Sequence, residues 1–157
     1  MKKLLLFSIA LSGFLPAFAQ KQTNAIVYAE HPALAMIDEF LTATIHGDPE
    51  RIAHYLTDDF KFYNGTSAAR YDPGIRRARF VKLAVRYCQE PVFITIDPFP
   101  DAHPDAVEYR EDNNEEVWVQ TWNIPKGFDK TTGVRLNAAA PRLYKVSKDN
   151  KIKIIIN

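Results

Sequence analysis

The spacing of the apolar residues changes once along this chain, near Pro91. Before that point apolar side chains recur at three- and four-residue steps, as in the helix predicted from residue 32 to about 46. After it, short runs rich in β-branched and aromatic residues alternate with turn-forming residues. The strands predicted from these runs cover residues 92–96, 106–109, 117–124, 134–144 and 152–156. Helices followed by strands within 157 residues predict one α+β domain that ends in an antiparallel meander.

A second helix is predicted directly after the first. Gly47 ends the first helix, Asp48 can accept hydrogen bonds from the next free amide groups, and Pro49 suits a new first turn. Asp58 and Asp59 are predicted to end the second helix. Its predicted buried stripe consists of Ile52, Tyr55, Leu56 and Phe60, and a short strand at 60–63 then leads to a turn at Asn64-Gly65.

The third predicted helix covers residues 75–88 and has two distinct faces. One face is predicted to be buried and consists of Ala78, Val81, Val85 and Cys88. The other carries Arg79, Lys82 and Arg86, which we interpret as a solvated face rather than a binding surface.

Residues 1–19 have the features of a secretory signal peptide. Lys2 and Lys3 supply a positive start, an apolar stretch follows over residues 4–15, and Ala17-Phe18-Ala19 provides small residues for cleavage before Gln20. The apolar stretch is shorter than the roughly 20 residues that span a bilayer, so we expect cleavage and no stable membrane anchor. The predicted organisation is a signal peptide at 1–19, an N-terminal extension at 20–29 and one domain at 30–157, exported to the periplasm or the cell exterior.

Charge and residue counts exclude several classes of function. The chain has 20 Lys and Arg against 19 Asp and Glu, with no long basic run, so a nucleic-acid partner is not expected. Cys88 is the only cysteine, which leaves no internal disulfide. The six glycines form no phosphate-binding loop, and the four histidines have no metal-ligand spacing. We therefore expect neither a metal nor another cofactor.

Three features occur in one order along residues 30–157: two short helices joined at Gly47-Asp48, the segment 55–60 leading into a strand, and a terminal meander that closes on 148–152. This order resembles the nuclear transport factor 2-like, or SnoaL-like, superfamily, here as an exported bacterial member. The resemblance implies a cystatin-like α+β cone, in which three helices pack on a curved antiparallel sheet around an apolar pocket. It also implies that a homodimer through the sheet is one arrangement to expect. Its members include both enzymes and non-catalytic modules, so the resemblance speaks to fold rather than to function.

The superfamily resemblance lets the catalytic positions of ketosteroid isomerase be counted onto this chain. Counting from Gly47-Asp48 places its donor tyrosine at Phe40 and its base aspartate at Asn64. Counting back from the hairpin at 149–151 places its protonated aspartate at Arg142. Phe40 cannot donate a hydrogen bond, Asn64 cannot take up a proton near neutral pH, and Arg142 is permanently charged, so ketosteroid isomerase activity is not expected.

Two other side chains are candidates for proton transfer. His54 precedes Asp58 by one turn of the predicted second helix, where the carboxylate could orient the imidazole, although a surface histidine is the alternative. Tyr63 would enter the pocket if the count to Asn64 slipped by one residue. Either residue would point to a lyase or an isomerase of the same fold.

The predicted strands add aromatic and basic candidates for ligand binding. Alternation along 117–124 places Trp118, Gln120 and Trp122 on one strand face, which either lines the cone or covers a dimer surface. Arg142 could bind a carboxylate through two parallel hydrogen bonds, unless a bulge at Pro141 turns it to solvent.

These candidates favour a non-catalytic module that binds a small apolar or aromatic molecule, including an anionic one. The predicted ligand-binding residues are Phe40, Tyr63, Asn64, Trp118, Gln120, Trp122 and Arg142. The alternatives are an enzyme that uses Tyr63 or His54, and a dimeric interaction module whose cone is filled by its own side chains.

Overall fold

The structure is a computed structural model, and it describes residues 25–65, 73–89, 91–98, 100, 103–109, 116–137 and 139–157. The predicted signal peptide lies outside these residues. Within them, no helix is both long enough and apolar enough to cross a bilayer.

Three helices form in the first half of the described chain. They are α1 (Pro32–His46), α2 (Pro49–His54) and α3 (Arg77–Gln89). The corner between α1 and α2 is built as predicted. Gly47 adopts a left-handed conformation with φ of 64° and ends α1, and the Asp48 carboxylate accepts hydrogen bonds from the Glu50 and Arg51 amides.

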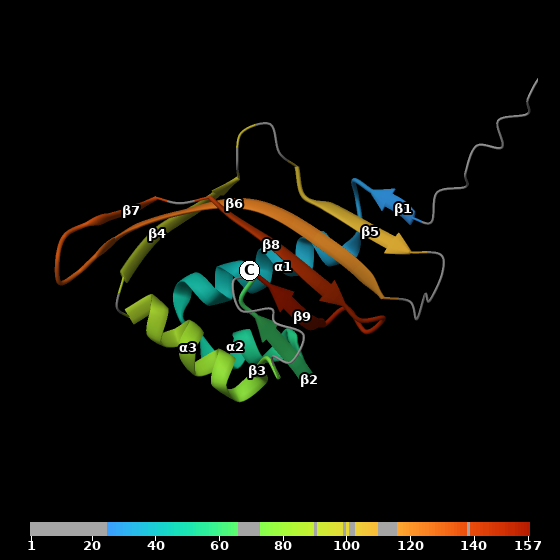
Figure 1. The fold of residues 1–157 in the computed structure, drawn as a ribbon, viewed down its shortest axis with the longest axis horizontal. Helices are drawn as coiled ribbons and strands as arrows, with labels where there is room; N and C mark the ends of the chain where they lie inside the picture. The colour runs from blue at the N-terminus through green and yellow to red at the C-terminus, as the bar shows by residue number, and fades with distance from the viewer. Residues whose placement is uncertain are drawn as a thin grey trace, which may run out of the picture.

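Nine strands make one sheet in the described part of the chain. They are β1 (Ala25–Tyr28), β2 (Leu56–Tyr63), β3 (Ile75–Arg76), β4 (Pro91–Pro98), β5 (Asp105–Tyr109), β6 (Val117–Asp129), β7 (Arg135–Asn137), β8 (Ala140–Val146) and β9 (Ile152–Ile156). Their main order is β1-β5-β6-β8-β9-β2-β3, and β4 and β7 pair with the far half of β6. The α+β prediction, with three helices packed on a curved sheet, is therefore confirmed (Figure 1).

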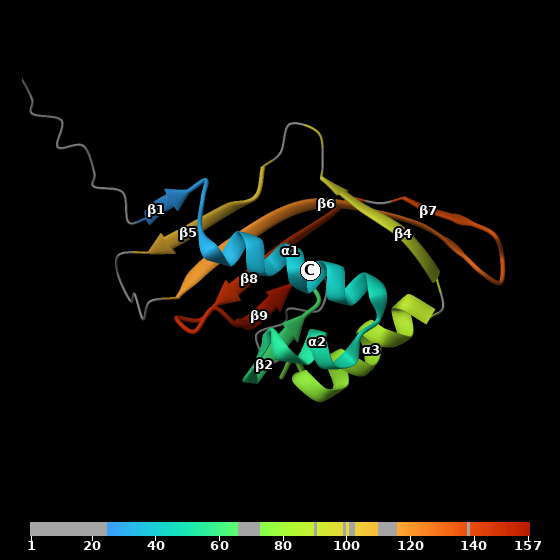
Figure 2. The same cartoon turned by 180° about the vertical axis from the view of Figure 1, so that it is seen from behind.

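The helices all cover the same side of the sheet. Figures 1 and 2 show β6 running across the molecule, with α1, α2 and α3 together on one side of it. The core lies between these layers and takes its largest fully buried side chains from α1, α2, β2, β6, β8 and β9. Those side chains are Phe40, Ile37, Ile52, Leu56, Phe60, Val119, Tyr144, Val146 and Ile152. The layered arrangement directs the inner faces of β2, β6, β8 and β9 at the helices.

The second helix is shorter than predicted, because residues 56–63 form a strand instead. β2 pairs in parallel with β9, with Leu56 opposite Ile152, and the Ile152 amide donates to the Tyr55 carbonyl at 2.7 Å. Asp58 and Asp59 therefore lie within a strand, and the prediction that they end a helix is wrong. The apolar residues Leu56 and Phe60 fit either a helical or an alternating pattern, and the pairing with β9 decides between the two. This parallel pair also makes the sheet mixed rather than purely antiparallel.

β6 is longer than the strand predicted at 117–124 and continues to Asp129. Pro125 lies opposite Ile96 of β4, at a point where pairing with β8 has ended and pairing with β7 has not begun. A proline is tolerated there because no ladder hydrogen bond is required from its nitrogen on that side. The predicted strand at 134–144 is divided into β7 and β8.

Within the predicted N-terminal extension at 20–29, β1 pairs with β5. One smaller prediction needs correction. On α3, Ala78 is exposed and Val81, Val85 and Cys88 are half-buried, while Ala84 is buried. The packing face of α3 is thus rotated from the predicted one. Arg79, Lys82 and Arg86 are exposed.

Candidate functional site

An apolar cavity of about 590 Å³ lies between α1, α3 and the inner side of the sheet. We call it the aromatic cavity. Its lining residues are Phe40, Thr44, Ile45, Phe62, Asn64, Ile75, Phe80, Leu83, Ala84, Tyr87, Cys88, Ile96, Pro125, Arg142, Ile155 and Asn157. This volume falls within the usual range of small-molecule sites, which are mostly apolar with a few polar groups.

Helical and strand periodicities together explain which side chains reach the cavity. On α3, the four residues Phe80, Leu83, Ala84 and Tyr87 recur at the three- and four-residue steps of one helix face. Alternation along β2 brings Phe62 to the cavity, and Asn64, the residue directly after the strand, also lines it. The cavity therefore follows from regular elements rather than from a loop.

Phenylalanine rings form one part of the cavity wall. Phe80 is at its centre: its ring centroid lies 6.4 Å from that of Phe40 and 5.4 Å from that of Phe62. It also lies 5.0 Å from the centroid of Phe60 in the core beneath. Such offset and tilted ring contacts stabilise the fold by more than the burial of their apolar area alone. They make this wall continuous with the hydrophobic core.

Three polar residues of the cavity come together where β8, β9 and β2 lie side by side. Leu143 of β8 is opposite Ile156 of β9, which in turn is opposite Tyr63 of β2. The adjoining residues Arg142, Asn157 and Asn64 consequently come together, and we call this group the polar edge. The Arg142 Nε–H donates to Asn157 Oδ1 at 2.9 Å.

Backbone hydrogen bonds hold Asn157 in place at the polar edge. Its amide donates to the Tyr63 carbonyl at 3.1 Å, and its backbone oxygen accepts from the Gly65 amide at 2.5 Å. Asn157 is thereby hydrogen-bonded to the last residue of β2 and to Gly65, which follows the strand.

Cys88 contributes a thiol to the wall on α3. Its Sγ donates to the Thr44 carbonyl of α1 at 2.5 Å, which ties the two helices together. Burial raises the pKa of this thiol above its ordinary value, and a contact with the Gly47 backbone opposes the shift more weakly. Cys88 is therefore mainly a protonated, weakly reactive group at neutral pH.

The structure brings together three of the seven predicted ligand-binding residues. Phe40, Asn64 and Arg142 all line the aromatic cavity, although they come from α1, the end of β2 and β8. β8 pairs with β6 without a bulge from Ala140 to Val146, so Arg142 shares the inner face with the fully buried Tyr144.

Tyr63 and His54 are placed elsewhere. Tyr63 packs against Gly74, where an added Cβ would lie 2.9 Å from the tyrosine ring. His54 is exposed at the end of α2, with its ring 5.4 Å from that of Tyr55. The predicted pairing of His54 with Asp58 is wrong, because Asp58 lies on β2 and its carboxylate binds Arg77 Nη1 at 2.5 Å.

Trp118, Gln120 and Trp122 lie on the outer face of β6 and do not line the aromatic cavity. The inner face of that strand carries Val117, Val119 and Thr121, all buried. The Lys145 ammonium lies 5.9 Å from the centre of the Trp118 ring, and Trp122 is 40% exposed. The predicted alternation along β6 is correct, but the indoles lie on the face away from the helices, and Pro125 is the β6 residue that lines the cavity.

Several wall residues were not singled out from the sequence. Phe62, Phe80 and Leu83 appear there only as apolar residues, and Asn157 lies beyond the last strand without a motif around it. Helical spacing along α3 could have identified Phe80 and Leu83. Asn157 depends on the parallel pairing of β2 with β9, for which the sequence carries no local signal.

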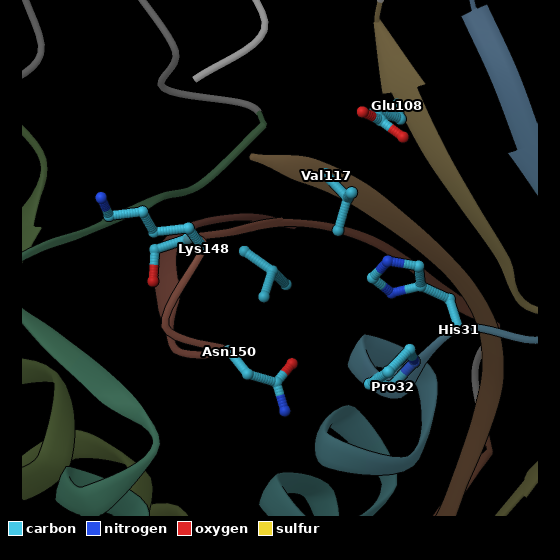
Figure 3. Close-up of a pocket in the computed structure, with 8 residues that line it drawn as sticks. His31, Pro32, Glu108, Val117, Lys148 and Asn150 are labelled. Atoms are coloured by element: carbon cyan, nitrogen blue, oxygen red, sulfur yellow. The ribbon is translucent and has the colours of Figure 1, made fainter. Parts of the chain in front are cut away.

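A second hollow of about 530 Å³, the rim pocket, opens beside the N-terminal end of α1. It is lined by His31, Pro32, Glu108, Val117, Val146, Ser147, Lys148 and Asn150. His31 and Asn150 direct their side chains toward its centre, and Lys148 lies on the side opposite His31 (Figure 3).

Hydrogen bonds already engage two side chains of the rim pocket. His31 Nδ1 accepts from the Ala33 amide at 3.1 Å and so caps α1, which leaves the proton of the neutral ring on Nε2. The Glu108 carboxylate accepts from the Tyr28 hydroxyl at 2.7 Å. These contacts give His31 and Glu108 structural roles in joining β1, β5 and α1.

Sequence and structure comparisons give different results. No protein-family model and no curated protein sequence matches the chain. Solved structures do match. A ketosteroid isomerase-like protein from Erwinia carotovora atroseptica has a TM-score of 0.57 at 16% identity, over 79% of this chain and 90% of that one. An LEH-like epoxide hydrolase from M. tuberculosis has a TM-score of 0.55 at 18% identity, over 79% of both chains.

A third match is a protein from Shewanella denitrificans described as a SnoaL-like polyketide cyclase. Its TM-score is 0.51 at 13% identity, over 80% of this chain and 89% of that one. The chain has the nuclear transport factor 2-like fold. The predicted resemblance is confirmed at the level of architecture. At these identities the nuclear transport factor 2-like fold carries no activity by itself, because unrelated chemistries share it.

Proposed function

We propose that this chain is a binding module that holds a small apolar or aromatic molecule in the aromatic cavity without converting it. The observation that carries the proposal is the chemistry of the wall. Among the described residues that line it there is no Asp, Glu or His, whereas apolar and aromatic side chains form most of it. General acid–base catalysis requires a group that exchanges a proton near neutral pH within reach of the ligand.

The alternatives have weaker support. The enzyme alternative relied on Tyr63 or His54, and neither lines the aromatic cavity. The filled-cone alternative required the protein's own side chains to occupy the interior, whereas about 590 Å³ is open there. Export of the chain stays a prediction from residues 1–19.

Two substitutions on α3 test the proposal as a matched pair. Ala84 lines the cavity and is 6% exposed, whereas Ala78 is exposed on the same helix. Ala84→Phe should fill the cavity, and Ala78→Phe should leave it open. Binding of 2-naphthoate, 2-naphthol, decanoate and decanol to residues 20–157 would be measured by calorimetry and thermal unfolding.

We expect at least one probe to stabilise the parent protein and the Ala78→Phe variant but not the Ala84→Phe variant. A probe at about a hundred times its dissociation constant should add roughly 2.7 kcal/mol to the free energy of unfolding. The proposal is wrong if no probe binds, or if Ala84→Phe binds as tightly as the parent. Recovery of a chemically altered probe would overturn the non-catalytic part.

A further inference from the structure

Arg142 has the only charged side chain among the described residues that line the aromatic cavity. It is half-buried on the inner face of β8, so its guanidinium is partly removed from water. Its Nε–H donates to Asn157 Oδ1, and within the described residues neither terminal nitrogen, Nη1 or Nη2, has a hydrogen-bond partner. A partly desolvated cation with two uncommitted donor nitrogens provides a site for an anion.

The engaged nitrogen restricts how an anion can bind. A guanidinium offers its donors in a rigid planar fork, either along the Nε side or across the two terminal nitrogens. Asn157 occupies Nε, which leaves the end with Nη1 and Nη2. The donors on that end match the two oxygens of a carboxylate, each accepting one N–H. A single cation next to an apolar wall also balances one negative charge and not two, because unpaired buried charge is costly.

We propose that the ligand is a monocarboxylate with an aromatic or alkyl body, bound end-on through its two oxygens to Nη1 and Nη2 of Arg142. Its body packs against the wall formed by Phe40, Phe62 and Phe80. This inference rests on the proposed function and names the ligand class of the same cavity. Asn157 is a positioning residue: its hydrogen bond to Nε fixes the orientation of the guanidinium and so the direction in which both terminal nitrogens point.

Matched pairs of probes test the carboxylate directly. The pairs are 2-naphthoate with 2-naphthamide, and decanoate with decanamide, so that each pair shares one body and differs in charge. Dissociation constants would be measured by calorimetry for the parent, Arg142→Met, Arg142→Lys and Arg79→Met. Met keeps much of the apolar stem of Arg142. Arg79 is an exposed α3 residue outside the cavity lining, so Arg79→Met removes the same charge without touching the site.

We expect the parent and Arg79→Met to bind each carboxylate at least about tenfold more tightly than its amide, a difference of about 1.4 kcal/mol. Arg142→Met should abolish this preference and leave amide binding within about twofold. Arg142→Lys should retain only part of it, because an ammonium lacks the planar pair of donors.

Asn157→Ala separates positioning from simple structural support. We expect it to reduce the carboxylate preference severalfold while the affinity for 2-naphthamide stays unchanged. A loss of affinity for both probes would contradict the positioning role.

The two proposals fail in different ways. If both members of a pair bind equally, or if Arg142→Met keeps the preference, the carboxylate inference is wrong while the binding function stands. If no probe binds, or if Ala84→Phe binds as tightly as the parent, the binding function itself is wrong.

Discussion

The aromatic cavity and the rim pocket enclose similar volumes, about 590 and about 530 Å³, but their walls differ. The first takes its phenylalanine wall from the hydrophobic core and carries one charged side chain among the residues that the structure describes. The second mixes acidic, basic and neutral polar side chains, and two of them already hold secondary structure together. The comparison teaches that volume does not identify a binding site. What matters is whether the wall leaves groups uncommitted for a ligand.

The largest expected effect comes from removing a ring of the aromatic wall. Phe40 is 1% exposed, and its ring lies close to those of Phe80 and Tyr144. Phe40→Ala should lower the free energy of unfolding by about 3–5 kcal/mol, measured by urea denaturation. Lys148→Ala, in the exposed wall of the rim pocket, should change it by no more than about 0.5 kcal/mol. If the two substitutions lower the free energy of unfolding equally, the aromatic cavity is not more strongly coupled to the core than the rim pocket is.

Alkylation of Cys88 should report which pocket is occupied. Iodoacetamide should modify this thiol slowly, because its raised pKa leaves little thiolate. At ten times its dissociation constant, 2-naphthoate should slow the modification about tenfold further, followed by mass spectrometry. In the matched variant Cys88→Ser with Ser147→Cys, the thiol sits in the rim pocket and should gain no protection. If 2-naphthoate protects the thiol at position 147 instead, the ligand binds in the rim pocket and not in the aromatic cavity.

His31→Ala should cost about 1 kcal/mol of stability, because it removes the acceptor that caps α1. His31→Asn supplies an oxygen acceptor and should restore most of the loss in thermal unfolding. Neither variant should alter the affinity for 2-naphthoate. A selective loss of that affinity would show that the rim pocket takes part in binding.

The smallest expected effect concerns Glu116, next to the rim-pocket residue Val117. Lys145 and Lys153 bind its two carboxylate oxygens at 2.6 and 2.7 Å. Hydrogen bonds from these two lysines lower the pKa of Glu116 below its ordinary value. Its contribution to stability is thus present above about pH 5 and is lost as the pH falls through the lowered pKa.

Acid titration of the unfolding free energy would test this linkage. Glu116→Gln should be less stable than the parent by at most about 1 kcal/mol near neutral pH, and the two curves should converge in acid. Asp149→Asn, on the exposed β8–β9 hairpin, serves as the control. A constant difference between parent and Glu116→Gln at all pH values would contradict the assigned cause.

The sequence predicts the architecture better than it predicts the orientation of individual strands. The Gly47-Asp48 corner, three helices and most strands follow from local patterns. Period-two alternation separates Trp118 from Val119 correctly, but alternation is symmetric and does not say which face is inside. That choice is made by the helices, which pack on the face carrying Val117, Val119 and Thr121.

The residues of the candidate site also differ in whether local sequence patterns predict them. Phe40, Asn64 and Arg142 were found because counts from two turns placed them at positions that the fold brings together. Phe80 was available from helical spacing. Asn157 was not, because its place depends on a pairing between β2 and β9 that joins distant parts of the chain.

The parallel pairing of β2 with β9 also has a consequence for how the protein is made. Leu56 is paired with Ile152, about a hundred residues later. At about 5–20 residues per second, a ribosome needs on the order of 5–20 s to add the partner strand. During that interval one edge of β2 has no partner strand. The apolar side chains of β2 are then exposed to neighbouring nascent chains. Lys61 and the adjacent acidic pair Asp58 and Asp59 place charges on that strand, which disfavours edge-to-edge association until β9 arrives.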